Sequence, residues 1–237
     1  MASNDWVVLT SSLSGSNVAK GVTSGVARPS GGGGFCYVMN ALTANVGGVG
    51  LYASPQPPNT NFNPLLKGCD VSAAMQRGQA NGLTGYSCFI FALAQGTDIT
   101  DEAYMLGLSD GNPCHIELRK GVMQGGLPDE APLGPNVVLA RSTDTVAIGE
   151  WVHLRLEVIC NVSGDTVINC FRNMGDVTAP AWVDIPGIPA GPSFVDDVAG
   201  INSGSLPFAG GRAGFGGAFA GTTRRCYFDQ FKLLKQV

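Results

Sequence analysis

The chain has 237 residues, a formal net charge of −4 and 14% charged residues against 44% hydrophobic ones. An acidic chain lacks the basic groups that nucleic-acid phosphates require, so we expect no nucleic-acid partner. The most apolar run, GYSCFIFALAQG, has about half of the roughly 20 residues that a membrane-spanning helix needs, so we expect no membrane insertion. The first residues, MASNDWVVLTSS, lack the basic start and the apolar centre of a secretion signal.

The sequence contains 34 glycines and 14 prolines and shows no sustained helical periodicity. Many short strands joined by Gly/Pro turns are typical of an all-β sandwich. No charged linker, low-complexity run or long internal repeat divides the chain. We predict an all-β fold, a two-sheet antiparallel β-sandwich formed by one domain over residues 1–237.

Apolar and β-branched runs predict strands that are separated by turn residues. The Ser/Gly-rich stretch up to residue 34 is expected to be a loop, and the four prolines of residues 54–64 exclude an interior strand. The expected strands are residues 6–9, 35–39, 49–53, 69–77, 86–95, 104–110, 114–119, 137–141, 152–160, 166–168, 182–185, 210–220 and 225–235.

The clearest strand pattern lies between residues 149 and 173. Five apolar residues take every second position with polar residues between them, which indicates a strand with one buried face. Ser163-Gly164-Asp165 supplies turn chemistry, so the stretch predicts an antiparallel hairpin. The expected inward residues are Val152, Leu154, Leu156, Val158 and Cys160, and the expected outward ones are His153, Arg155 and Glu157.

Three segments of the second half resemble one known fold family. They are G-E-W-V-H-L-R-L-E-V, G-R-A-G-F-G and R-C-Y-F-D-Q-F-K-L, in this order. Their arrangement over residues 103–237 is similar to that of the concanavalin A-like lectin/glucanase sandwich, the laminin-G-like jelly roll. The resemblance implies that the closing Phe-Asp-x-Phe strand pairs with the N-terminal strand. Members of the family include lectins, glycosidases, carbohydrate-binding modules and phage virion proteins.

Glycosidases of that family carry acidic residues alternating along one strand, so that two carboxylates project together from the concave face. This sequence has no such strand, because Glu117 and Glu157 each stand alone on the polar side of a predicted strand and Asp196-Asp197 lie in a predicted loop. The two histidines, His115 and His153, are too few for a three-histidine metal site and are expected at polar strand positions. We predict that the protein is not an enzyme, with a glycoside hydrolase as the enzymatic alternative.

Asp229 is expected on the inward face of the last strand, together with Tyr227, Phe231 and Leu233. A buried carboxylate needs a partner, because an unpaired buried charge is too costly. The favoured interpretation is that Asp229 caps backbone amides or pairs with Arg224 or Arg225, without a cofactor. The alternative follows from the resemblance, since related jelly rolls hold a structural calcium ion with an aspartate of the closing strand and carbonyl oxygens.

Carbohydrate binding needs an exposed aromatic platform beside amide and carboxylate groups, and Trp182 with Asp110 and Asn112 fits this requirement best. Trp182 is equally interpreted as a plug that packs its loop on the sandwich. Residues 178–211 are rich in Pro, Gly, Ser and Asp, and a loop of this length usually carries a function or a contact. The candidate interface residues are Trp182, Phe194 and Phe208.

The seven cysteines lie mostly inside predicted strands and form no CxxC motif, so we expect free, buried thiols. Low charge, long Gly/Pro loops, free cysteines and an extracellular-type fold without a secretion signal favour a structural or attachment component of a larger assembly. We predict a phage virion protein (tail, fibre or capsid decoration), made in a bacterial cytoplasm, whose partners are other copies of itself or other virion proteins. The runner-up is a carbohydrate-binding module, whose partner is a cell-surface glycan.

Overall fold

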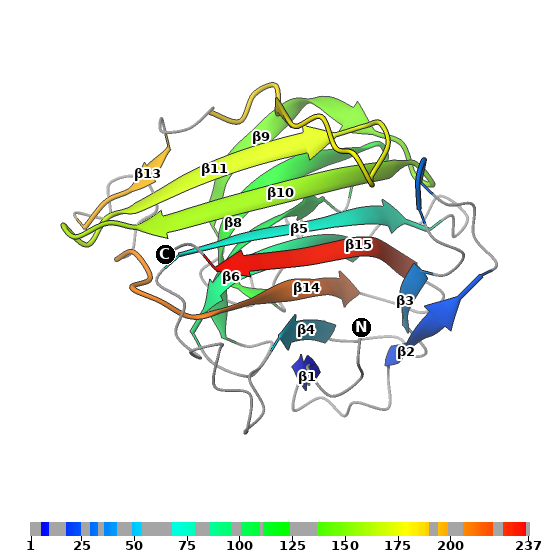
Figure 1. Cartoon of the computed structure of the whole chain (residues 1–237), viewed down its shortest axis with the longest axis horizontal. Helices are drawn as coiled ribbons and strands as arrows, with labels where there is room; N and C mark the ends of the chain where they lie inside the picture. Colours follow the sequence, from blue (N-terminus) through cyan, green and yellow to red (C-terminus); the bar gives the residue numbers. More distant parts are fainter. Residues whose placement is uncertain are drawn as a thin grey trace.

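Fifteen strands make up the described part of the chain and form two antiparallel sheets (Figure 1). The computed structural model describes residues 6–9, 18–24, 29–32, 36–41, 49–53, 68–78, 86–95, 101–109, 111–123, 137–189, 194–198, 206–219 and 225–235. Within these ranges there is no helix long and apolar enough to cross a membrane. The expected all-β, two-sheet antiparallel class is confirmed.

The first sheet has seven strands in the order β1-β4-β14-β6-β7-β8-β9. The apolar strand β6 is central in this sheet, and the β7–β8 hairpin follows it. Its strands are β1 (Trp6–Leu9), β4 (Val49–Ala53), β14 (Arg212–Phe219), β6 (Tyr86–Ala94), β7 (Glu102–Leu108), β8 (Cys114–Val122) and β9 (Val137–Val146).

The second sheet has eight strands, seven of them in the order β12-β11-β10-β5-β15-β3-β2, while β13 pairs with β11. The predicted hairpin is its β10–β11 pair, in register from His153 opposite Asn173 to Cys160 opposite Thr166. Its strands are β12 (Val183–Asp184), β11 (Thr166–Asn173), β10 (Trp151–Cys160), β5 (Gly68–Arg77), β15 (Arg225–Lys235), β3 (Cys36–Ala41), β2 (Val18–Thr23) and β13 (Val195–Asp196).

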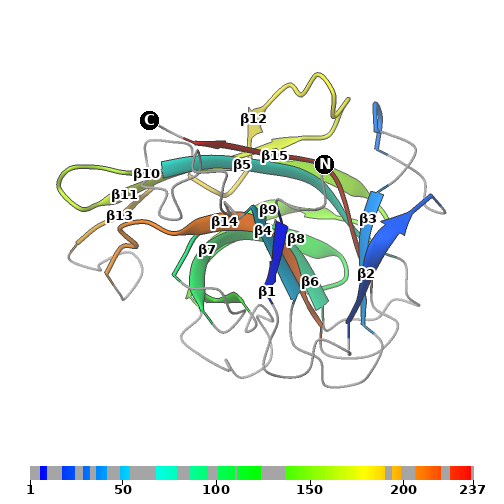
Figure 2. The same cartoon turned by 60° about the horizontal axis from the view of Figure 1, so that its bottom comes forward.

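The core lies between the sheets, where alternate residues of facing strands meet. In β10 the expected inward residues Val152, Leu154, Leu156 and Val158 are at most 1% exposed, while Cys160 at the strand end is partly exposed. The strands β7 and β8 bend strongly, and β5, β10 and β15 lie across the convex side of the bend (Figure 2). The seven-stranded sheet therefore has a concave face turned away from the core.

Two strands were not expected from the sequence, and one expected pairing is wrong. Strand β2 lies in the Ser/Gly-rich stretch that was expected to be a loop, and β13 is too short to show a period of two. The closing strand β15 pairs with β3 and β5, whereas the N-terminal strand β1 pairs with β4 in the other sheet. These pairings depend on partners far away in the chain, which a local pattern does not report.

The prediction that Asp229 lies on the inward face of the last strand is also wrong. The register between β15 and β5 shifts between Asp229 and Lys232, and Gln230 has a φ of 50°. This bulge reverses the alternation, so that Cys226 and Phe228 pack in the core before it and Phe231 and Leu233 after it. Tyr227 and Asp229 therefore lie on the opposite face, where Asp229 stands opposite Ala74.

Within its described residues, the long stretch of residues 178–211 packs several apolar side chains on its own sandwich. Phe194 and Phe208 are 9% and 7% exposed and belong to the hydrophobic core, so their expected position on an exposed contact surface is wrong. Strand β13 ties the segment to β11 through the pairs Thr166–Asp196 and Val167–Val195. All seven cysteines are free thiols, as expected, and only Cys160 is partly exposed.

Candidate functional site

Polar and aromatic side chains collect on the face of the eight-stranded sheet that is turned away from the core, called the outer face below. The strand registers arrange them in three rows across β11, β10, β5 and β15. The rows are Asn173–His153–Ala74–Asp229, Phe171–Arg155–Ser72–Lys232 and Asn169–Glu157–Asp70–Leu234. The alternation of β10 is the local cause, since its polar residues His153, Arg155 and Glu157 take every second position and point to this face.

Arg155 is the centre of the outer face. Its Nε lies 3.0 Å from both carboxylate oxygens of Asp70, and a terminal guanidinium nitrogen lies 2.7 Å from Asp70 Oδ2. The guanidinium carbon is 5.3 Å from the ring centre of Phe171 and 5.8 Å from that of Trp182. The hydrogen bond to Asp70 raises the pKa of Arg155, so this planar donor is held charged and in one orientation.

Trp182 lies over the outer face and is half-buried. Its ring meets that of His153 edge-to-face at 4.6 Å, besides its contact with Arg155. Trp182 thus packs its segment on the sheet, as the plug interpretation states, while part of the ring stays accessible. In the row on the other side of Arg155, Asn169 Nδ2 donates a hydrogen bond of 2.8 Å to Glu157 Oε2. An aromatic ring, a guanidinium, two carboxylates and an amide therefore share this face.

The other two residues predicted to join Trp182 in a ligand site are not brought to it. Asn112 is exposed in the turn between β7 and β8, in the seven-stranded sheet. The turn is held by Arg77, whose guanidinium donates hydrogen bonds of 2.7 and 2.5 Å to the carbonyls of Ser109 and Gly111. Asp110 lies outside the described residues.

His153 is 1% exposed, although its position in the alternation predicts a solvent-facing residue. Trp182, which follows it by 29 positions in the chain, covers the ring. Neither ring nitrogen has a hydrogen-bond partner within the described ranges. Burial, and secondly the charge of Lys232, lower the pKa of His153 from its ordinary 6.5 to about 4.

We expect acid to destabilise the fold through His153. The folded state holds the neutral ring and the unfolded state protonates it near pH 6.5, so the stabilisation is complete above that pH and is lost as the pH falls towards 4. Within this window each pH unit costs up to about 1.4 kcal/mol. Urea unfolding at pH 7, 6, 5 and 4 measures the slope. A His153→Leu variant is the control and should have a shallower slope, while equal slopes in both proteins would contradict the assignment.

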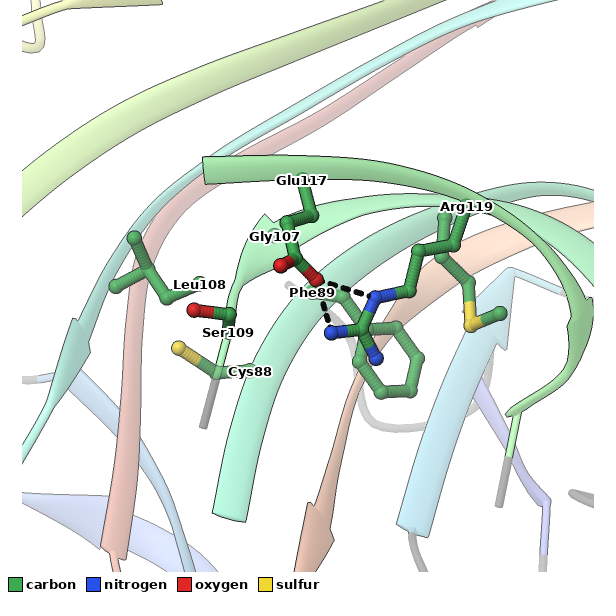
Figure 3. A pocket seen from close by; sticks show the side chains of 8 residues that line it. Cys88, Phe89, Gly107, Leu108, Ser109, Glu117 and Arg119 are labelled. Atoms are coloured by element: carbon green, nitrogen blue, oxygen red, sulfur yellow. Dashed lines mark hydrogen bonds and ion pairs between the residues drawn. The ribbon is translucent and has the colours of Figure 1, made fainter. Parts of the chain in front are cut away.

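The concave face of the seven-stranded sheet holds a second polar cluster (Figure 3). A small hollow, partly open to solvent, lies beneath β8 and is lined by Phe89, Met105, Ser109, Glu117 and Arg119, among others. Glu117 and Arg119 are 2% and 6% exposed, which corrects their expected place on a solvated strand face. Glu117 contacts two arginines, with Arg119 Nε at 2.7 Å and an Arg141 guanidinium nitrogen at 2.6 Å.

Glu117 is the one carboxylate among the described residues that line this hollow. Retaining glycosidases need two carboxyl groups about 5–5.5 Å apart, one as nucleophile and one as acid. Glu117 is held by two arginines in ion pairs and has no second carboxylate beside it in the described lining. The described lining of this hollow therefore offers one of the two carboxyl groups of that arrangement.

No protein-family model matches the sequence, and no curated protein matches it. Among solved structures, a cellulose-induced protein, Cip1, superimposes with a TM-score of 0.55 at 13% identity, over 98% of this chain and 92% of that one. Two further structures have lower scores. The marine PL-14 alginate lyase from Aplysia kurodai has a TM-score of 0.48 at 9% identity, over 85% and 83% of the two chains. The exoplasmic/lumenal domain of VIP36, in its Ca²⁺/Man3GlcNAc-bound form, has a TM-score of 0.47 at 11% identity, over 97% of this chain and 88% of that one.

The fold is a concanavalin A-like jelly roll. At these identities the likeness concerns the fold alone, and the chemistry has to come from the residues of this chain.

Asp229 is the residue for which the resemblance implies a calcium ligand. Among the described residues, no group of three or more His, Cys, Asp or Glu side chains could hold a metal ion, so protein ligands other than Asp229 would have to be carbonyl, hydroxyl or amide oxygens. Asp229 Oδ1 accepts the backbone N–H of Gln230 at 2.8 Å, which is the amide cap expected for it. Its Oδ2 is buried and has no hydrogen-bond partner in the part of the chain that the structure describes. A Cβ on Gly32 would lie 2.8 Å from this oxygen, so the glycine keeps the space beside it free. A buried carboxylate oxygen without a proton donor is a suitable ligand for a hard cation.

Proposed function

We propose that the chain is a carbohydrate-binding domain whose ligand surface is the outer face around Trp182 and Arg155. The observation that carries the proposal is the fixed Arg155 guanidinium between two aromatic rings, with Asp70, Glu157 and Asn169 beside it. The resemblance of the closing segments to a family that includes lectins and carbohydrate-binding modules supports the same function.

The residue types suit a sugar because a pyranose has an apolar C–H face and a rim of hydroxyl groups. An accessible part of the Trp182 ring offers apolar contact area at little loss of side-chain freedom. The planar guanidinium and the amide offer pairs of hydrogen bonds to neighbouring hydroxyl groups, and the carboxylates accept from them. Asp70 and Glu157 hold Arg155 before any ligand arrives, which reduces the cost of ordering it.

Binding without hydrolysis is part of this proposal. The ion pairs of Glu117 support it on the concave face, as described above. On the outer face, Asp70 and Glu157 are both engaged with Arg155, and Glu157 also accepts from Asn169. Their oxygens are therefore already engaged by donors of the protein, which suits holding Arg155 in place for a ligand.

A Trp182→Ala variant tests the assignment. The protein is first screened on a glycan array, and the affinity for the best glycan is then measured by calorimetry. Loss of the ring is expected to cost about 2 kcal/mol or more, a roughly 30-fold rise in Kd. The matched control is Val183→Ala, the neighbouring residue, which is 52% exposed and should leave Kd unchanged. A wild-type protein that binds no glycan, or a folded Trp182→Ala variant with the wild-type Kd, would refute the proposal.

Assembly into a larger particle, the function that composition favours, is the second candidate. The observation in its favour is strand β9, which ends the seven-stranded sheet and exposes Val137 and Val138 by 37% and 41%. An edge strand with exposed apolar side chains is a template for pairing with another chain. Native mass measurements over a range of concentrations test it, and a monomer at every concentration would count against self-association.

We propose further that Asp229 holds a structural calcium ion when calcium is present. The ion would bind Asp229 Oδ2, the buried carboxylate oxygen that has no hydrogen-bond partner within the described residues. Calcium is then expected to raise the melting temperature of the wild type relative to protein in a chelator, and to leave Asp229→Asn unchanged. Asp184→Asn, an exposed aspartate of β12, is the control and should respond like the wild type. Equal melting temperatures of the wild type with calcium and with chelator would rule the site out.

A further inference from the structure

A lysine, an aspartate and a tyrosine meet in the interior at the end of the sandwich where β13 lies beside β11 (Figure 1). The side chains of Lys120 and Asp196 are 2% and 0% exposed, and Tyr104 is fully buried. Lys120 follows the inward residues of β8, Tyr104 lies opposite it on β7, and Asp196 comes from β13. Charged side chains are almost never fully buried unless they are paired, so this cluster needs an explanation.

The three side chains converge on one oxygen. Lys120 Nζ lies 2.6 Å from Asp196 Oδ2, and the hydroxyl of Tyr104 donates a hydrogen bond to the same Oδ2. Lys120 Nζ also donates to the carbonyl of Leu206 at 2.7 Å, and the backbone N–H of Phe208 donates to the Tyr104 hydroxyl at 3.3 Å. The lysine nitrogen is 5.0 Å from the ring centre of Phe208 and 5.7 Å from that of Tyr104. An amine and a carboxyl group are thus held in contact between aromatic rings.

Such a pair has a chemical alternative to remaining ionic. Two buried charges lose the favourable free energy of hydration, and their mutual attraction compensates for this loss only in part. The transfer of a proton from an ammonium group to a carboxylate gives a neutral amine and a neutral acid. This transfer costs less free energy in apolar surroundings than in water. A neutral amine beside a carboxyl carbon is a nucleophile, and two groups fixed in contact react with a very high effective concentration.

We propose that Lys120 and Asp196 condense to an isopeptide bond in the folded protein. A bond forms between Lys120 Nζ and Asp196 Cγ, and the bond between Cγ and Oδ1 breaks. Oδ1 leaves as water with two of the three protons of the lysine ammonium group, and the third proton stays on the amide nitrogen. No oxidant, reductant or co-reactant takes part, and the opposite charges of the two groups disappear together.

Tyr104 has a role in this step. Its hydroxyl donates to Oδ2, the oxygen that becomes negative in the tetrahedral intermediate and remains as the amide oxygen. The N–H of Phe208 polarises that hydroxyl from its other side. Burial and the neighbouring carboxylate raise the pKa of Tyr104 far above its usual range, so the hydroxyl keeps its proton and remains a donor.

The bond would connect the two sheets covalently. Lys120 belongs to the seven-stranded sheet, while β13 pairs with β11 of the eight-stranded one, and 76 positions of the chain separate the two residues. The link would also fix the segment around β13, which has few strand contacts of its own.

The mass of the intact, denatured wild-type protein tests the proposal without any variant. The expected mass is lower than that of the sequence by one water, and a tryptic digest is expected to contain a branched peptide joining Lys120, uncleaved, to Asp196. Lys120→Met is expected to have its full sequence mass, and Asp196→Asn to lose ammonia in place of water. Tyr104→Phe is expected to condense more slowly. A wild-type protein of full mass after prolonged incubation, or a water loss that maps to the Asp110-Gly111 dipeptide, would overturn the proposal.

Discussion

Replacing Asp196 with alanine is expected to lower the free energy of unfolding by about 3–5 kcal/mol, because the change leaves Lys120 as a lone charge in the interior. The lysine side chain is 2% exposed, so water solvates its ammonium group little in the native state. Tyr104 loses the acceptor of its hydroxyl at the same time. Urea unfolding at pH 7 measures the difference.

A double variant, Asp196→Ala with Lys120→Met, separates the lone charge from the loss of packing. It removes the uncompensated ammonium group and is expected to be more stable than Asp196→Ala alone. Neither variant can form the isopeptide bond, so their difference reports on the buried charge. A double variant that is less stable than the single one would show that Lys120 stabilises the fold through other contacts, such as that with the carbonyl of Leu206.

Phe194→Ala is expected to destabilise the fold by about 3–5 kcal/mol, the usual cost of removing a buried phenylalanine. The ring is 9% exposed and belongs to the main core cluster, and its backbone carbonyl accepts the N–H of Ile168 at 3.1 Å. Thermal unfolding is the measurement, and the melting temperature should fall strongly.

Leu206→Ala is the matched control for Phe194. Leu206 belongs to the same long segment but is 70% exposed, so its truncation should change the stability by less than about 0.5 kcal/mol. If both variants melted like the wild type, Phe194 would not be part of the core, and its expected role in a contact surface would again be open. The pair therefore tests whether the segment packs on its own sandwich.

The outer face illustrates how a fold that is common to many proteins acquires a site of its own. Arg155 is an ordinary outward residue of an amphipathic strand until β11 brings Phe171 and β5 brings Asp70 beside it. Trp182 completes the cluster from beyond the end of β11. Of the three residues predicted for a ligand site, Trp182 lies in this cluster, Asn112 is in a turn of the other sheet, and Asp110 is outside the described residues.

Local patterns were sufficient to predict most strands and the inward residues of β10. The period of two that places Leu154 and Leu156 in the core is set within the strand itself, because successive side chains point to opposite sides. The same reasoning correctly predicted the β10–β11 hairpin, whose partners are joined by a short turn. It missed β2 and β13, where the sequence offers no clear alternation.

What the tertiary structure decided is which outward residues are covered and which distant residues meet. His153 and Glu117 have the alternation of solvent-facing residues, yet both are buried, His153 under Trp182 and Glu117 in ion pairs with arginines. Asp196 finds Lys120 across 76 positions of the chain, and the bulge at Gln230 turns Asp229 to the outer face. A strand's alternation depends only on its own backbone, whereas the cover on a face and the partner of a buried charge come from segments far away in the chain. The sequence by itself therefore determined the strands and the core side of most of them, and only the packing of distant segments determined the buried charges and the candidate site.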